Sequence, residues 1–129
     1  MIKIGIALVL ILHGLVHLLY LGQSRRLFEL QPGMIWPDGS WAFSPIFAAG
    51  TSRTLAVLFL ALAALGFVAG GAAFLAGLSW WWPLLATTAL FSSAIYILCW
   101  NGAWRCAQEQ GAIGILINLV IITAVLLSN

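Results

Sequence analysis

The chain has 129 residues, of which 64% are hydrophobic and only 6% are charged. This composition lies far outside the range of soluble globular domains, and it also excludes an intrinsically disordered chain. The net charge is only +2, and the basic residues are too scattered to form a nucleic-acid-binding surface. The composition therefore predicts an integral membrane protein whose first partner is the lipid bilayer.

The apolar segments predict four membrane-spanning helices. A helix rises about 1.5 Å per residue, so about 20 apolar residues cross a hydrocarbon core about 30 Å thick. The uncharged run between Arg53 and Arg105 has 51 residues, enough for two spans, with Pro83 in the first turn of the second. We expect an all-α four-helix bundle in one domain, because backbone groups in lipid must be paired and the chain is too short for a barrel. The predicted spans are residues 4–22, 54–78, 83–101 and 111–128.

Residues 23–53, between the first two spans, differ from the rest of the chain. They carry most of the charge and three of the four prolines, and Pro37-Asp38-Gly39 predicts a turn. Their aromatic side chains are typical of the headgroup region of a membrane. We interpret this segment as an interfacial cap with a short helix at 24–30, and we expect Thr51 or Ser52 to be the N-cap of the second span.

The arginines predict the orientation in the membrane. Four arginines lie beside the loops that follow the first and third spans, whereas the opposite side carries only Lys3. The positive-inside rule then favours a multi-pass membrane protein with these loops in the cytoplasm and both termini outside. In the alternative orientation, residues 1–22 are an uncleaved signal-like anchor, and Lys3 lies on the cytoplasmic side. We expect Cys99 and Cys106 to be free thiols, because a helical spacing of seven residues is too long for a disulfide.

Two histidines in the first span are the leading functional candidates. His13 and His17 lie one turn apart on one helix face, which Tyr20 continues. Ionisable side chains inside a bilayer are rare, and they usually face the bundle interior or a cavity. Counting from the helix end places His17 about 7 Å and His13 about 13 Å deep. Polar residues of the third and fourth spans are expected at similar depth, namely Ser92, Tyr96 and Asn118.

Four interpretations of the histidine pair are open. Structural zinc requires four ligands, and the carboxylates lie outside the spans. One haem requires axial ligands on opposite faces of its ring, which one helix face does not supply. We therefore do not expect this chain alone to hold a metal or haem. A quinone or another lipid-soluble molecule needs only a hydrogen bond and an apolar cleft, and Trp36, Asp38 and Trp41 would then form a lid. Alternatively, the histidines simply fasten helices through Ser92, Asn118 or backbone carbonyls.

Small residues recur along one face of the second span. Such a stripe lets helix backbones approach closely, so we expect it to pack against another helix of this chain or of a partner. The stripe consists of Ala63, Gly66, Gly70, Ala73 and Gly77.

Several stretches resemble a group of small bacterial four-span membrane proteins. They are His13-Gly14-Leu15-Val16-His17, residues 28–44 (FELQPGMIWPDGSWAFS) and Gly114-Ile115-Leu116-Ile117-Asn118. The resemblance implies a membrane bundle located in the bacterial inner membrane, and it transfers no catalytic residue. A looser similarity, in size and span count, is to the DoxX-like proteins, some of which associate with thiosulfate or quinone redox systems.

Two functions follow as hypotheses. The first is a small accessory or structural subunit that packs against a larger membrane complex or self-associates, because the chain shows no nucleophile–base pair and no carboxylate dyad. The sequence therefore favours a non-enzymatic protein. The alternative is binding of a lipid-soluble small molecule such as a quinone, or a lipid, at the cluster of polar side chains in one leaflet.

Overall fold

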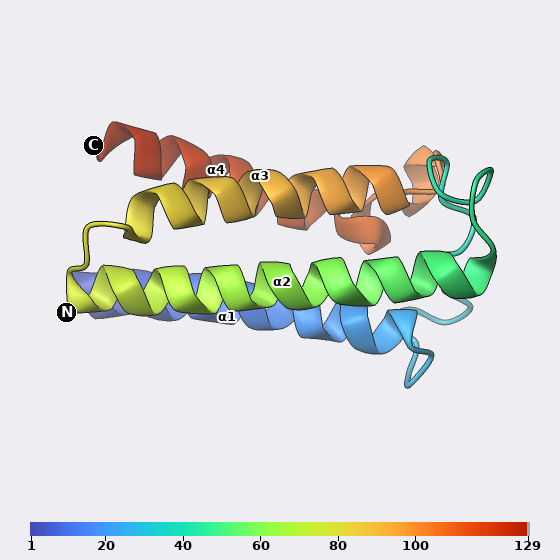
Figure 1. The fold of residues 1–129 in the computed structure, drawn as a ribbon, viewed down its shortest axis with the longest axis horizontal. Helices are drawn as coiled ribbons and strands as arrows, with labels where there is room; N and C mark the ends of the chain where they lie inside the picture. Colours follow the sequence, from blue (N-terminus) through green and yellow to red (C-terminus); the bar gives the residue numbers. More distant parts are fainter. Residues whose placement is uncertain (129) are drawn as a thin grey trace.

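The computed structural model describes residues 1–128 and confirms the all-α four-helix bundle. Figure 1 shows long helices lying side by side, with both chain ends at one end of the bundle and the loop between the first two helices at the other. No strand occurs in the described part of the chain. The long helices are α1 (Ile2–Ser24), α2 (Ala49–Ala76), α3 (Trp81–Cys99) and α4 (Ile113–Leu127), with the short turns η1 (Trp104–Cys106) and η2 (Gln108–Ala112) before α4.

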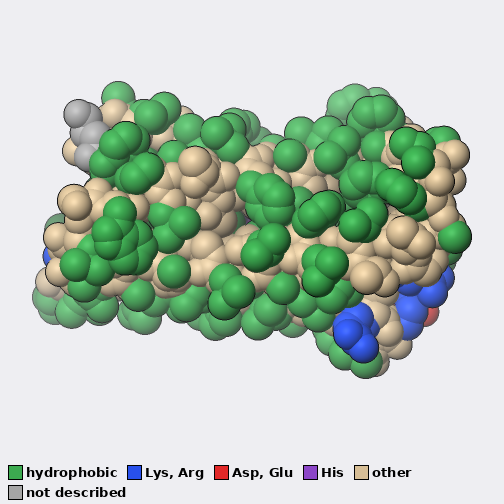
Figure 2. Space-filling model, in the orientation of Figure 1, with side chains coloured by type: hydrophobic (Ala, Val, Ile, Leu, Met, Phe, Trp, Pro, Cys, Tyr) green, Lys and Arg blue, Asp and Glu red, His purple; other side chains and the backbone are tan. Residues whose placement is uncertain are grey.

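The helices have the length and composition of membrane spans. Each of the four, with η2 and α4 counted together as Gln108–Leu127, is long and apolar enough to cross a bilayer. Large apolar side chains are exposed along their outer faces, such as Leu12 in α1, Leu65 in α2 and Val120 in α4. Figure 2 shows these side chains along the whole length of the molecule, with most of the visible Lys and Arg at the end that the cap covers. The protein is therefore a multi-pass membrane protein.

The helices pack in chain order and leave one side open. α1 packs on α2, α2 on α3, and α3 on α4. In contrast, no Cα atom of α1 lies within 8 Å of a Cα atom of α4, although both helices are fully described. The bundle is therefore an arc of neighbouring helices, whose first and last members are held apart.

The stripe of small residues packs inside this chain. A Cβ atom added to Gly66 would lie 2.4 Å from the Thr88 hydroxyl, and one added to Gly70 would lie 2.5 Å from Leu85, both in α3. Gly77 has a different role, because it ends α2 in the left-handed conformation with φ 73°. The partner of the stripe is therefore α3 of the same chain.

A second close approach, between α1 and α2, was not predicted. A Cβ atom on Gly14 would lie 2.8 Å from the Cβ of Phe67, and one on Gly71 would lie 2.9 Å from Ile11 and 3.3 Å from the Ala7 carbonyl. Glycines on both helices thus allow the α1 and α2 backbones to approach closely.

The expected helix at 24–30 is wrong, because α1 stops at Ser24. Arg26 adopts the left-handed conformation with φ 59°. The Leu27 N–H bonds to the Gly22 carbonyl and the Arg26 N–H to the Gln23 carbonyl, each at 3.0 Å. These two bonds form a Schellman motif, which ends a helix. Residues 25–48 then continue as turns and irregular chain.

The other helix boundaries differ from the predicted ones by a few residues. α2 begins at Ala49 with the extended Ala48 as its N-cap, so neither Thr51 nor Ser52 has that position. Pro83 lies in the first turn of α3, as expected. Before α4, Gly111 has φ 102° and kinks the chain, so that regular helix begins only at Ile113.

Candidate functional site

The candidate site is a hydrogen-bonded ring of four side chains inside the bundle. His13 Nε2 lies 2.8 Å from Asn118 Oδ1, and His17 Nε2 lies 2.7 Å from Ser92 Oγ. Asn118 Nδ2 donates to Ser92 Oγ at 3.0 Å, and His17 Nδ1 lies 3.0 Å from the His13 carbonyl oxygen. All four side chains are buried. The structure thus brings together polar residues of α1, α3 and α4 that residue counting had placed at similar depth.

The carbonyl of His13 fixes the direction of these hydrogen bonds. Because a carbonyl only accepts, His17 carries its proton on Nδ1, and its Nε2 accepts from the Ser92 hydroxyl. Ser92 in turn accepts from the Asn118 amide, whose oxygen accepts from His13 Nε2–H. Neutral histidines satisfy every bond of this ring. The arrangement therefore fits the interpretation in which the histidines fasten helices, and it also defines the groups that a ligand could displace.

Aromatic rings surround the polar ring and connect it to the cap. The ring of Phe67 lies 4.7 Å from that of His13 and 5.3 Å from that of His17, between centroids. On the cap side, Tyr96 lies 5.7 Å from His17 and 5.0 Å from Tyr20. The Tyr20 hydroxyl donates to the Glu109 carbonyl at 2.9 Å, so it joins α1 to η2.

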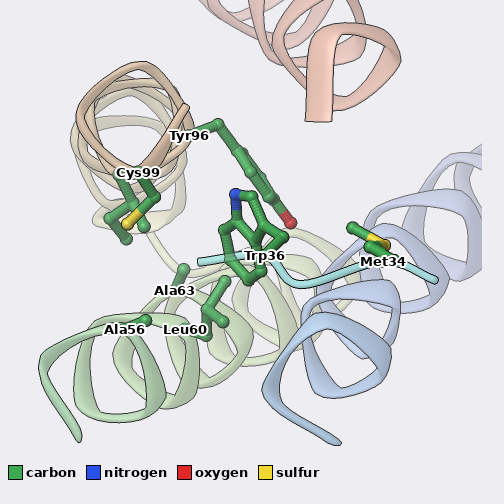
Figure 3. Close-up of a cluster of buried hydrophobic side chains, with 8 residues drawn as sticks. Met34, Trp36, Ala56, Leu60, Ala63, Tyr96 and Cys99 are labelled. Carbon is green, nitrogen blue, oxygen red and sulfur yellow. The ribbon is translucent and has the colours of Figure 1, made fainter. Parts of the chain in front are cut away.

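The three residues expected to form a lid occupy different environments. Figure 3 shows Trp36 inserted between the helices, beside Tyr96 and above Leu60. Its side chain is 1% exposed, and its indole N–H has no hydrogen-bond partner among the residues that the structure describes. Trp41 donates its indole N–H to the Ile97 carbonyl at 2.6 Å and remains exposed. The lid role stays a prediction, but Trp36 is part of the packed core rather than a surface flap.

Asp38 is the charged centre of the cap. Its carboxylate binds Arg53 of α2 through two hydrogen bonds, one of them 2.9 Å long from Nε, and it also binds Arg26 at 2.8 Å. Arg26 in addition donates to the backbone carbonyls of Met34, Ile35 and Trp36. The hydrogen bond from Arg53, followed by that from Arg26, holds the pKa of Asp38 below its ordinary value of 3.8. These contacts attach the cap to the ends of α1 and α2.

We expect acid to weaken the cap. Because the pKa of Asp38 is lower in the folded protein than in the unfolded chain, its contribution to stability is present above about pH 4 and is lost as the pH falls through the folded value. Thermal unfolding of the purified protein in micelles should therefore show a falling midpoint below pH 4. Asp38→Asn should lower the midpoint at pH 7 and reduce this acid dependence. An unchanged acid dependence in Asp38→Asn would assign the effect to another group.

Asn118 is the residue whose loss should disturb the polar ring most. Asn118→Leu removes the acceptor of His13 and the donor to both Ser92 and Ser93. We expect it to lower the free energy of unfolding by about 1–3 kcal/mol, because buried polar groups lose their partners. The matched control is Thr123→Val in the same helix, since the exposed Thr123 hydroxyl bonds only within α4, to Leu119. Equal effects of both changes on thermal unfolding would show that the ring does not stabilise the bundle.

A cavity of about 490 Å³ lies beyond the polar ring, between α1 and α4 and towards the chain ends. Leu10 and Ile121, which both line it, stand one helical turn from His13 and Asn118 respectively. The His13–Asn118 hydrogen bond thus crosses the gap between α1 and α4 next to the inner end of the cavity. Other lining side chains are apolar as well, among them Ile6, Phe74, Leu85 and Val125.

Metal-binding side chains and thiols are the remaining candidates for a site in the bundle. Within residues 1–128, no three His, Cys, Asp or Glu side chains come close enough together to hold a metal ion. Cys99 is buried and Cys106 is partly buried, and both are free thiols.

Some residues of the site were missed from the sequence. Ser93 accepts a hydrogen bond from Asn118 at 3.1 Å, and Gln23 ties α1 to the cap by donating to the Met34 carbonyl and accepting from the Leu30 N–H. The place of Gln23 directly after the predicted span 4–22 is a sequence signal that could have identified this contact. Comparison of the chain with protein-family models, with curated proteins and with solved structures gave no match.

Proposed function

We propose that the protein binds a lipid-soluble molecule with a hydrogen-bonding head group, such as a quinone, in the cavity between α1 and α4. One observation carries the proposal: an apolar cavity of about 490 Å³ ends one helical turn from the His13–Asn118 bond. Small-molecule sites commonly combine such an apolar volume, about 300–1,000 Å³, with a few polar groups that fix the orientation of the ligand.

The His13–Asn118 pair, one helical turn beyond the lining residues Leu10 and Ile121, offers both a donor and an acceptor to a head group that reaches past them. A carbonyl oxygen of the ligand can accept from His13 Nε2–H in place of the Asn118 oxygen. A ligand hydroxyl can instead donate to Asn118 Oδ1. The oxidised and reduced forms of a quinone present these two groups, whereas a plain hydrocarbon chain presents neither. The exchange leaves His17 and Ser92 paired with each other.

Mass spectrometry of organic extracts from the purified protein tests the proposal. We expect a lipid-soluble molecule with carbonyl or hydroxyl groups to be enriched over its share of the membrane. Ala124→Phe, which places a ring in the cavity, should abolish the enrichment. Ala72→Phe on the exposed face of α2 is the control and should retain it. An extract containing phospholipids alone, in their bulk proportions, would contradict the proposal.

His13→Leu distinguishes the contribution of the His13 hydrogen bond to ligand binding from the contribution of the apolar cavity. If His13 binds the head group, this variant should lose the polar ligand while retaining the elution volume of the folded protein. A folded His13→Leu protein with full occupancy would show that the cavity alone determines binding.

A second candidate is the role of accessory subunit. The small-residue stripe no longer supports it, because α3 covers the stripe. The cap supplies a different argument: Leu27, Ile35 and Ile46 lie outside the four long helices and are 70%, 62% and 73% exposed. A partner protein would cover these side chains. Gentle solubilisation of native membranes followed by sizing tests this, and a monomer without a co-purifying chain would count against it.

We also propose that the cap and the α3–α4 connection face the cytoplasm of a bacterial cell, with both termini outside, on the basis of the arginine distribution. Ser40 is buried, so Gln31 is the better labelling position in the cap, and the exposed Ser79 serves in the α2–α3 turn. In a Cys106→Ala background, an impermeant thiol reagent applied to intact cells should label Ser79→Cys but not Gln31→Cys. The reverse pattern would place the termini inside.

A further inference from the structure

A second pocket, independent of the α1–α4 cavity, lies at the cap end of the bundle. It has a volume of about 270 Å³ and is formed where α1 ends and α2 begins. Three of its lining residues are arginines, whereas the lining of the α1–α4 cavity is mainly apolar. The lining residues are Ser24, Arg25, Arg26, Arg53, Thr54 and Val57.

The pocket has an excess of positive charge. The carboxylate of Asp38 pairs with both Arg26 and Arg53. Three guanidinium groups and one carboxylate leave a formal charge of +2 around the pocket, counted as three minus one. A positive pocket of this kind favours an anionic ligand.

The unused hydrogen-bond donors of the pocket also favour a ligand that accepts hydrogen bonds. The hydroxyl groups of Ser24 and Thr54 donate to carbonyls of their own helices, at 2.9 and 3.0 Å. Arg26 is engaged with Asp38 and with the backbone of the cap. Arg53 uses Nε and Nη2 for Asp38, which leaves Nη1 without a hydrogen-bond partner in the structure. Within residues 1–128 the Arg25 side chain makes no hydrogen bond or ion pair, so its whole guanidinium fork can bind the oxygens of an anion.

The level of the pocket in the membrane identifies the source of the anion. Arg25 directly follows the last residue of α1, and Arg53 lies near the start of α2, which places both at the height of the lipid headgroups. Val57 lies one helical turn beyond Arg53 towards the hydrocarbon and gives the pocket an apolar wall. A molecule with a phosphate at headgroup height and a hydrocarbon chain below it matches both features.

We propose that this pocket binds the phosphate of an anionic phospholipid, with Arg25 and Arg53 as its donors and the acyl chains passing Val57 into the bilayer. Basic pockets between membrane helices are suited to such headgroups. A zwitterionic lipid is a poorer ligand, because its cationic group meets the positive charge of the pocket.

Arg25→Gln provides the test, because the Arg25 side chain makes no contact that the fold needs. The matched control is Arg105→Gln, which removes an exposed arginine of η1 at the same end of the molecule. The purified proteins are titrated in micelles with dioleoylphosphatidylglycerol or dioleoylphosphatidylcholine, and bound lipid is counted by native mass spectrometry. We expect the wild type to prefer phosphatidylglycerol. Arg25→Gln should weaken that binding about fivefold, the effect of about one surface charge, and Arg105→Gln should not.

Three outcomes would overturn the proposal. Equal weakening by both variants would indicate a general charge effect rather than a site. Equal binding of the two lipids by the wild type would remove the requirement for an anion. Displacement of phosphatidylglycerol by millimolar inorganic phosphate, equally in the wild type and in Val57→Ser, would show that the pocket recognises a free phosphate and that the acyl chains contribute nothing.

Discussion

Trp36→Ala should lower the free energy of unfolding by about 3–5 kcal/mol, the usual cost of truncating a large buried aromatic side chain. The indole is 1% exposed, and its ring packs against those of Tyr20 and Tyr96, at 5.2 and 6.1 Å between centroids. Its loss would leave a cavity at the point where the cap enters the bundle. Thermal unfolding of the purified protein, with the remaining tryptophans as fluorescent reporters, measures the effect.

Trp36→Phe is the matched control for this prediction. It retains an aromatic ring and removes the indole N–H, which has no partner to lose. We therefore expect no more than about half of the destabilisation caused by Trp36→Ala. Equal losses in the two variants would mean that the position requires the full size of the indole and that a smaller aromatic ring contributes nothing.

The second large effect is expected from Gly111→Ala at the kink before α4. Gly111 has φ 102°, and a Cβ atom there would lie 2.2 Å from Cδ1 of Tyr96. The unfavourable backbone conformation costs about 1–2 kcal/mol, and overpacking costs about 1–3 kcal/mol. We expect a total loss of about 2–5 kcal/mol, measured by thermal unfolding in micelles.

Gly114→Ala, in the first turn of α4, tests a glycine that faces the same tyrosine but has no strained backbone. Its Cβ atom would lie 3.6 Å from Cε2 of Tyr96, an ordinary contact. Alanine also favours a helix over glycine, so this variant should be neutral or slightly stabilising. If Gly114→Ala were as damaging as Gly111→Ala, the kink would have no special role in the fold.

The fold was predictable because its main determinant is the length of the apolar segments. Three apolar runs were long enough to span a membrane, and Trp80, Trp81 and Trp82 with Pro83 divided the longest run into two helices. The boundaries were harder. Nothing in the sequence marks Arg26 as a left-handed residue, a position at which glycine or asparagine is usual, so the stop of α1 was placed incorrectly.

The candidate site was predictable to the extent that depth in a membrane can be counted. His13, His17, Ser92 and Asn118 were expected at similar levels, and the structure joins them by hydrogen bonds. Counting gives the height of a residue but not the distance between helices. The separation of α1 from α4 and the cavity between them depend on three-dimensional packing, which the apolar pattern of either helix does not encode.

The position of Trp36 could not be derived for a similar reason. Aromatic residues in a loop beside a membrane span are typical of the headgroup region, and Trp41 remains exposed as that rule suggests. Trp36 instead follows the backbone of the cap, which Gln23 and Arg26 hold by its carbonyl groups. Such contacts between distant parts of the chain have no local signature.

For the lipid-soluble ligand that we propose, the gap between α1 and α4 determines the route into the protein. Because the gap faces the hydrocarbon, a hydrophobic molecule can enter sideways by diffusion within the bilayer and never needs to pass through water. The concentration that governs its binding is then its mole fraction in the membrane, which for a lipid-soluble compound far exceeds its aqueous concentration. A modest intrinsic affinity is sufficient to fill such a site, and occupancy would follow the lipid composition of the cell.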